Sequence, residues 1–469
     1  MTDAAAPAAA PFPGYGSKGY RAYVLAALVT VYTFNFIDRV VITIIQEPIR
    51  LEFGLSDTQL GLLGGPTFAI LYTLLGIPIA RLAERKNRTT ILAVCLGLWS
   101  LMTTLCGFAG SYAMLLMARI GVSVGEAGGT PPSQSIIGDY FPAESRATAI
   151  SIYALGIPLG SAFAAIGGGF IAAYFGWREA FWMLGVPGLI LAILIKLTIK
   201  EPPRATPSAE PPNFGAALKI LGSKTSFWHI AVGGAAASFT GYGVGQFTNS
   251  FFIRNHQAAL TAMDTPWLPS FDEPLREVIF RASIITGLLT LFLGGLGTFL
   301  SGYISDKINS RHPNALAWLP AVGFVIATPL NIAGYMTGSL PLALFFLAAA
   351  LLLQNFYLGS IYAVAQGVVP PLMRATAVAI LLFIVNIIGY GMGPPVIGAL
   401  SDFLASSQLT PHGMTLAACR VPAAALTPVC SSGTSFGLRW ALILGYLGYI
   451  WAAAHFLLAW RTLQRDWVR

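Results

Sequence analysis

The chain has 469 residues, of which 55% are hydrophobic and only 10% are charged, and its mean hydropathy is +0.70. This composition is far more apolar than that of a soluble domain, so it excludes an ordinary soluble enzyme and indicates an integral membrane protein. The formal net charge of +8 does not indicate nucleic-acid binding, because Lys and Arg are scattered over short loops instead of gathering on one face.

Apolar segments long enough to cross a ~30 Å hydrocarbon core follow one another along the whole chain. They cover residues 20–46, 57–82, 89–110, 112–138, 147–174, 178–199, 226–252, 277–304, 315–337, 340–368, 375–403 and 434–461. The sequence therefore predicts an all-α membrane protein with twelve transmembrane helices. We expect two six-helix bundles, residues 20–199 and 226–461, joined by a cytosolic linker at residues 200–225.

The two ends of the chain lie outside these segments. Residues 1–19 are rich in Ala and Pro and lack the basic and apolar regions of a cleaved signal, which favours a flexible cytosolic tail. Residues 462–469 form a second cytosolic tail. Basic residues are more frequent in the loops on the side of the termini, so the positive-inside rule places both termini in the cytosol. Because no eukaryotic targeting signal is evident, we expect a multi-pass protein of a bacterial inner membrane.

Short repeats relate the two halves of the chain. Arg-Ala-Thr-Ala begins at Arg146 and again at Arg374, in each case just before the fifth segment of its half. The second and third segments are joined by "LAERKNR" from Leu82 in one half and by "ISDKINSR" from Ile304 in the other. Parallel repeats of this kind are a standard plan of secondary transporters, in which the substrate site lies between the halves near the middle of the membrane.

These loop motifs resemble the signature of the major facilitator superfamily, which has Gly, then Asp-Arg, then Gly-Arg. In the first copy Ala80 and Asn87 replace the two glycines and Glu84 replaces the Asp, whereas both arginines are kept. The resemblance implies a cytosolic gate between the halves, formed by Glu84, Arg85, Arg88, Asp306, Lys307 and Arg311. Ordinary positive-inside anchoring is the alternative, and it explains the bases but not the acid that occurs in both copies.

A narrower resemblance is carried by polar residues inside the first and fourth segments. The glycines of "RIGVSVGEAGG" from Arg119 and of "GIPLG" from Gly156 are similar to superfamily motifs of the fourth and fifth spans. The residues that resemble the Spinster subfamily are Asn35, Asp38, Arg39, Arg119 and Glu126. Animal members of that subfamily export sphingosine-1-phosphate or lysophospholipids, so the resemblance implies a lipid-like substrate and proton coupling through the two acids.

Four of these residues are ionisable groups within spans, where an uncompensated charge is expensive. At 1.5 Å per residue, Asp38 and Arg119 lie at similar depths, and Glu126 lies ~10 Å deeper than Arg119 on the same helix face. We expect Asp38 to face Arg119 and to carry the coupling proton, and Arg39 to border the cavity near an anionic headgroup. Glu126, whose pairing is less obvious, is expected to be a second proton carrier. The alternative is a structural ion-pair cluster between the two spans.

The four cysteines fall into two groups. Cys95 and Cys106 lie in the third segment and are expected to be small apolar core residues. Cys419 and Cys430 share the outer loop before the last segment. Because an exported loop lies in an oxidising space, we expect a disulfide between these two residues.

Motifs for catalysis and for ATP hydrolysis are not found. The sequence has no Walker-type loop and no Gly-x-Ser-x-Gly elbow, and His229 and His455 are expected to lie apart at span ends. We therefore expect no enzymatic activity, no cofactor and no metal site.

The C-terminal half has no acid or base that lies clearly in the middle of a span, so we expect its cavity wall to be largely apolar. A cavity that is charged on one wall and apolar on the other suits an anionic amphiphile. The sequence thus predicts a monomeric, proton-coupled secondary transporter of such a molecule, working by alternating access within the lipid bilayer. Two alternatives stay open: transport of a water-soluble organic anion, and a non-transporting lipid-binding receptor or scaffold.

Overall fold

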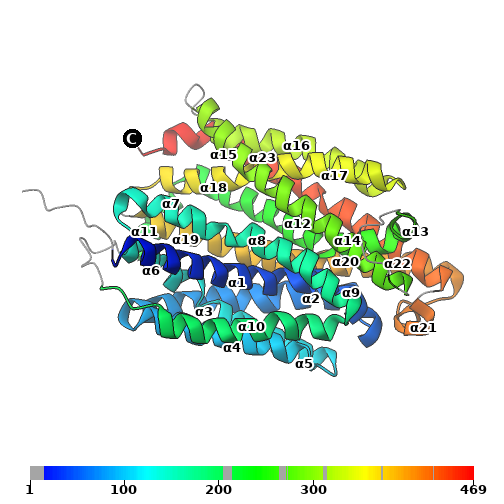
Figure 1. The fold of residues 1–469 in the computed structure, drawn as a ribbon. Helices are drawn as coiled ribbons and strands as arrows, with labels where there is room; N and C mark the ends of the chain where they lie inside the picture. The colour runs from blue at the N-terminus through cyan, green and yellow to red at the C-terminus, as the bar shows by residue number, and fades with distance from the viewer. Residues whose placement is uncertain are drawn as a thin grey trace, which may run out of the picture.

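The computed structural model describes residues 15–203, 214–263, 271, 273–309, 314–370, 373–425 and 427–468, and the regular elements in these ranges are all helices. In Figure 1 the long helices run along one common direction, so the chain crosses the molecule repeatedly. The first helix begins and the last helix ends at the same end of the molecule, which we call the terminal face. The opposite end, near α13 (Gln257–Thr261) and α21 (Pro422–Ala425), is the far face.

The N-terminal half of the chain forms the first six spans. Its helices are α1 (Lys18–Phe53), α2 (Asp57–Gly64), α3 (Pro66–Arg85), α4 (Arg88–Cys106), α5 (Tyr112–Glu126), α6 (Thr130–Tyr140), α7 (Ala143–Ala154), α8 (Gly156–Ala162), α9 (Gly169–Tyr174) and α10 (Trp177–Thr198). The pairs α2 with α3 and α5 with α6 each make one span. The segment α7 to α9 makes another, with a π-helical stretch at Phe163–Gly168.

The C-terminal half forms the other six spans. Besides α13 and α21, its helices are α12 (Thr225–Asn255), α14 (Pro274–Leu288), α15 (Gly295–Asn309), α16 (Ala315–Met336), α17 (Leu340–Gln354), α18 (Tyr357–Gly367), α19 (Arg374–Ile384), α20 (Met392–Leu409), α22 (Pro428–Gly445) and α23 (Leu447–Asp466). Further π-helical stretches join α14 to α15 and α19 to α20. A short helix, α11 (Phe214–Gly222), lies in the predicted linker.

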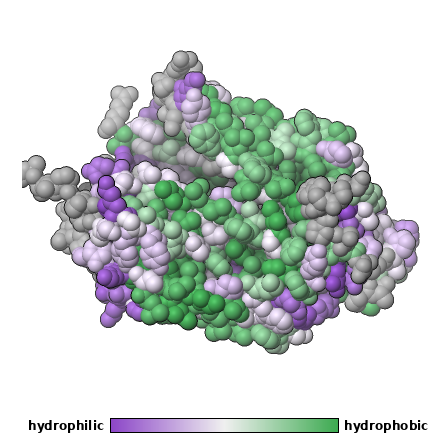
Figure 2. Space-filling model, in the orientation of Figure 1, coloured by the Kyte–Doolittle hydropathy of each residue, from purple (hydrophilic) through white to green (hydrophobic). Residues whose placement is uncertain are grey.

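Among the described residues, ten helical stretches are long and apolar enough to cross a membrane. The other two predicted spans are the pair α5 and α6 and the helix α12, which has 31 residues and carries many Gly, Ser and Thr that lower its hydropathy. Figure 2 shows hydrophobic side chains over the middle of the molecule and hydrophilic side chains at its two ends. Each of the twelve predicted spans falls on helices of the structure, which confirms the all-α prediction.

Glycines of the fifth-span motif bring α8 close to α1. A Cβ atom on Gly156 would lie 2.8 Å from the Tyr32 Cβ atom, and one on Gly160 would lie 2.6 Å from the Phe36 Cβ atom. Small residues allow this close backbone approach between helices in a membrane. The approach fixes the part of α1 that carries the polar residues predicted to form the site.

Candidate functional site

A cluster of polar side chains lies between α1 and α5. Asn35, Asp38, Arg119 and Glu126 are at most 2% exposed, and the Arg39 side chain is 17% exposed. Arg39 Nε donates a hydrogen bond to Glu126 Oε2 at 2.7 Å, and Asn35 Nδ2 donates to the same oxygen at 2.9 Å. The structure therefore brings the five predicted site residues of these two spans together, and we call them the charge cluster.

Asp38 and Arg119 meet, as their depths predict, but not through an ion pair between their side chains. Arg119 Nη1 donates to the backbone oxygen of Asp38 at 3.0 Å. The Asp38 Oδ1 atom has no hydrogen-bond partner, although Glu126 and Arg119 are its charged neighbours. The carboxylate that forms an ion pair is that of Glu126, because Asn35 and Arg39, four residues apart on one face of α1, both point at it.

Several buried polar atoms of the charge cluster lack a hydrogen-bond partner. They are Asn35 Oδ1, Asp38 Oδ1, Arg39 Nη2, Arg119 Nε, Arg119 Nη2 and Glu126 Oε1. Buried polar atoms in folded proteins are nearly always paired, and each unpaired one costs about 1–3 kcal/mol. A cluster with a purely structural role is expected to satisfy these atoms. These six atoms therefore remain available for further hydrogen bonds.

Aromatic rings surround the Arg39 guanidinium group. Its Cζ atom lies 5.2 Å from the ring centroid of Phe36, 4.6 Å from that of Phe68 and 4.5 Å from that of Tyr72. The Phe68 ring also contacts Tyr390 of the C-terminal bundle, with centroids 5.4 Å apart. These cation–π contacts hold Arg39 on the side of α1 that faces the other bundle.

The wall that the C-terminal bundle presents to Arg39 is more polar than the sequence analysis predicts, because it carries tyrosines. Tyr242 and Tyr390 have ring centroids 4.6 Å apart, and Tyr242 is 47% exposed. Both lie close enough to interact with the charge of Arg39. A sequence signal for these two residues exists, since each stands in a Gly-Tyr-Gly triplet, at residues 241–243 and 389–391.

The predicted cytosolic gate is only partly described by the structure. Glu84, Arg85 and Lys307 are exposed near the terminal face. The Asp306 side chain and the whole of Arg311 lie outside the described residues. The gate as a whole therefore stays a prediction.

Arg88, the sixth predicted gate residue, is buried and binds residues of its own bundle. Its Nη1 atom pairs with Asp139 and donates to Ser135 Oγ at 2.9 Å, and its Nε atom donates to Glu201 Oε1 at 2.7 Å. Arg88 thus ties the start of α4 to the end of α6 and to the segment that follows α10.

Charged side chains join the two bundles at the far face, in a site that the sequence analysis missed. Arg254 of α12 pairs with Glu47 of α1 at 2.6 Å and with Asp57 of α2 at 2.7 Å, and these side chains are at most 6% exposed. Asp402 of α20 accepts hydrogen bonds from the backbone N–H groups of Asp57 at 3.0 Å and of Thr58 at 2.9 Å. We call Glu47, Asp57, Arg254 and Asp402 the far-face lock.

Uncharged hydrogen bonds extend the far-face lock toward the middle of the molecule. Gln46 Nε2 donates to Gln246 O at 2.8 Å and to Ser250 Oγ at 2.7 Å, and Gln246 Nε2 donates back to Gln46 Oε1 at 2.8 Å. Asn249 Nδ2 donates to Ile44 O at 3.1 Å. The polar residues on this side of α12 therefore hold α1 of the other bundle.

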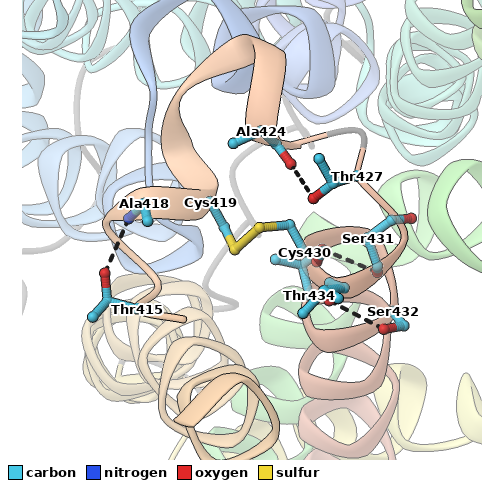
Figure 3. The surroundings of a disulfide bond; sticks show 10 residues. Thr415, Ala418, Cys419, Ala424, Thr427, Cys430, Ser431, Ser432 and Thr434 are labelled. Carbon is cyan, nitrogen blue, oxygen red and sulfur yellow. Dashed lines mark hydrogen bonds between the residues drawn. A yellow bond between two sulfur atoms is a disulfide. The ribbon is translucent and has the colours of Figure 1, made fainter. Parts of the chain in front are cut away.

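A disulfide joins Cys419 and Cys430, the pair predicted from the loop sequence. Figure 3 shows the bond between a short 3₁₀ turn and the start of α22. The loop that it closes lies over the far-face lock, where Cys419 and Arg420 line a small crevice together with Asp57 and Arg254.

His229 and His455, which were expected to lie apart, are in contact. Their Nδ1 atoms are 3.1 Å apart, because α12 packs along α23 and brings the two span ends to the same level. Within the part of the chain that the structure describes, no group of three or more His, Cys, Asp or Glu residues could hold a metal ion.

Comparisons with known proteins agree with this architecture. Residues 28–394 match the family model of the Major Facilitator Superfamily. An MFS-type efflux pump of Mycolicibacterium smegmatis is 31% identical over 382 residues, which are 81% of this chain and 84% of the pump. The sphingosine-1-phosphate transporter SPNS2 of Danio rerio is 28% identical over 393 residues, which are 80% of this chain and 75% of that transporter.

A solved structure extends the likeness to almost the whole chain. The crystal structure of a bacterial homolog of the human lysosomal transporter Spinster, inward-facing and unoccupied, matches with a TM-score of 0.85 at 37% identity. The match covers 97% of this chain and 100% of that chain. The chain therefore belongs to the major facilitator superfamily and is a transporter of the Spinster type.

Proposed function

We propose that the protein couples proton movement to the transport of an anionic amphiphile, such as a lysophospholipid or a sphingolipid-like molecule, across a bacterial inner membrane. The terminal face is then the cytosolic side, as the positive-inside rule indicates. The observation that carries the proposal is the charge cluster. It combines two buried acids with a cation that faces the other bundle, and it leaves several of its polar atoms unpaired.

The contacts between the bundles support an inward-facing state. The far-face lock joins α1 and α2 to α12 and α20, whereas Arg85 is exposed near the terminal face. The similar bacterial Spinster homolog is itself inward-facing. In the proposed cycle, rocking of one bundle against the other breaks the far-face lock and opens the site to the outside.

An anionic substrate and the Glu126 carboxylate would compete for Arg39, and this competition supports the coupling of substrate movement to proton movement. Arg39 Nε now binds Glu126 Oε2, and an anionic headgroup needs the same guanidinium group. When the headgroup takes Arg39, Glu126 loses its ion-pair partner and is neutralised by a proton. Asp38, whose Oδ1 atom makes no hydrogen bond, is the second acid available to this exchange.

The two tyrosines opposite Arg39 favour a second candidate, a water-soluble organic anion. Tyr242 and Tyr390 present hydroxyl groups that can bind a polar substrate as well as rings that can pack against an acyl chain. The substrate class must therefore be decided by measurement.

The test uses the purified protein in liposomes that contain a pH-sensitive dye. A panel of lysolipids and soluble organic anions is added to the wild type, to Asp38→Asn, to Glu126→Gln and to the exposed control Glu144→Gln. We expect a lysolipid to drive proton movement in the wild type and the control but not in the two cluster variants. Proton movement with soluble anions alone would favour the second candidate. No movement with any compound would support uniport or a scaffold role.

A further inference from the structure

A groove on the outer surface of the N-terminal bundle runs between α4 and α10. It has a volume of about 300 Å³ and is lined by Thr90, Ala93, Val94, Ala192, Ile193, Lys196 and Leu197. In Figure 1, α4 and α10 lie at the lower edge of the molecule, on the opposite side from α16 and α17. The groove therefore faces the surrounding bilayer and not the space between the bundles.

The sizes of the side chains create this groove. Ala93 and Ala192 are each 7% exposed and form its floor. Val94, Ile193 and Leu197 are 64%, 60% and 76% exposed and form its rims. In a membrane-spanning region, such an apolar channel suits an extended hydrocarbon chain.

One end of the groove carries a fixed cation. Lys196 Nζ donates to Thr90 Oγ1 at 2.6 Å, and an ammonium group has three donors, so two remain for a ligand. Lys196 lies two residues before α10 ends at Thr198, and Thr90 lies two residues after α4 begins at Arg88. This end is therefore at the membrane–water interface of the terminal face. Among the described residues, no carboxylate lies within 4.0 Å of the ammonium group.

We propose that this groove binds an anionic phospholipid of the bilayer, with one acyl chain between α4 and α10 and the phosphate at the ammonium group of Lys196, which Thr90 holds at the end of the groove. The argument is charge complementarity, because basic pockets between membrane helices bind anionic lipid headgroups. A zwitterionic lipid with the same acyl chains has the same apolar contacts but a weaker attraction to Lys196. The inference concerns the outer surface, so it does not depend on the transported substrate.

The test counts lipids that stay bound to the purified protein by native mass spectrometry. The protein is exchanged into equal mixtures of phosphatidylglycerol and phosphatidylcholine with identical acyl chains. We expect the wild type and Lys196→Arg to retain phosphatidylglycerol in preference to phosphatidylcholine by about fivefold, which is the effect of one basic residue near an anionic headgroup. In Lys196→Gln, this preference should disappear.

Two further variants separate the groove from general surface charge. Lys200→Gln removes an exposed lysine of the same face that does not line the groove, and it should keep the wild-type preference. Ala192→Leu fills the groove floor and should reduce the retention of both lipids. Equal retention of phosphatidylglycerol by the wild type and Lys196→Gln would overturn the proposal. This outcome decides the question even if Ala192→Leu does not fold. Loss of the preference in Lys200→Gln would overturn it as well.

Discussion

At the scale of single residues, Glu126 holds the charge cluster together. Its Oε2 atom accepts hydrogen bonds from Arg39 and Asn35, so both α1 side chains depend on one carboxylate oxygen. Asp38 is equally buried, but Arg119 reaches only its backbone oxygen. The two acids should therefore differ in what they contribute to folding.

Replacing Glu126 by Gln should destabilise the protein more than replacing Asp38 by Asn. Glu126→Gln leaves Arg39 without its carboxylate, and breaking a buried pair costs roughly 3–5 kcal/mol, with the lower end expected because Arg39 is partly exposed. Asp38→Asn keeps the hydrogen bond from Arg119, which goes to the backbone oxygen of Asp38, so its loss of stability should be smaller. Thermal unfolding of the purified variants measures the difference. Equal melting temperatures would contradict the pairing described here.

Arg39→Lys should reduce transport by at least about tenfold while the protein stays folded. A lysine ammonium group lacks the planar shape of a guanidinium group. It therefore cannot stack on the rings of Phe36, Phe68 and Tyr72 while it also binds the Glu126 carboxylate. Substrate uptake into liposomes is the measurement. The matched control is Arg178→Lys, because Arg178 also pairs with a carboxylate, that of Glu52, and stacks on an aromatic ring outside the charge cluster.

The sequence predicts which residues form the charge cluster but not how they pair. Depth along a span follows from the fixed rise per residue, so the meeting of Asp38 with Arg119 could be predicted. The rotation of α1 relative to α5 depends on packing against other helices, and it directs Arg39 toward Glu126. Tyr242 and Tyr390 were missed for a similar reason, since α12 and the π-helical stretch between α19 and α20 come together only in the folded bundle.

At the scale of helices, the far-face lock is built on the beginning of α2. Asp402 accepts hydrogen bonds from the first N–H groups of this helix and from Thr58 Oγ1. A carboxylate at a helix N-terminus satisfies N–H groups that have no partner within the helix and interacts favourably with the helix dipole. The acid comes from the other bundle, so a helix cap here also joins the two halves.

Asp402→Asn should make the far face open more often. The loss of the charged cap removes about 1 kcal/mol from the free energy that holds the far face closed. The ratio of open to closed molecules should therefore rise by roughly fivefold. The measurement is the labelling rate of Ser250→Cys, a buried position behind the lock, by an impermeant maleimide added from the far side. Glu52→Gln, which removes an acid of the same face that pairs within one bundle, should leave the rate unchanged. A rate unaffected by Asp402→Asn would argue against the lock.

The spans themselves were predictable, whereas the lock was not. Runs of about 20 apolar residues define the membrane segments directly. The breaks within spans, such as the one between α2 and α3 at Gly65, leave no signal in hydropathy. Glu47, Asp57, Arg254 and Asp402 stand near span ends, where charges are common, so nothing local marks them as partners across the two halves.

At the scale of the whole molecule, the repeats predict two bundles but not which side of the molecule is closed. In the proposed alternating-access cycle one sequence must support both states, so the difference in free energy between them is small. In this structure the far-face lock and the disulfide-closed loop lie on the same side. Transport then requires that the bundles separate there, and this requirement can be tested without knowing how protons are coupled.

A cross-link between the bundles at the far face should stop transport reversibly. The Thr58 hydroxyl contacts the Asp402 carboxylate at 2.5 Å, so cysteines at these two positions are placed to form a disulfide between α2 and α20. We expect oxidation of the double variant Thr58→Cys with Asp402→Cys to abolish substrate uptake and reductant to restore it. The single variants, treated with the same reductant, control for reduction of the Cys419–Cys430 bond. Uptake by the oxidised Thr58–Asp402 variant would mean that the two halves do not separate at this face.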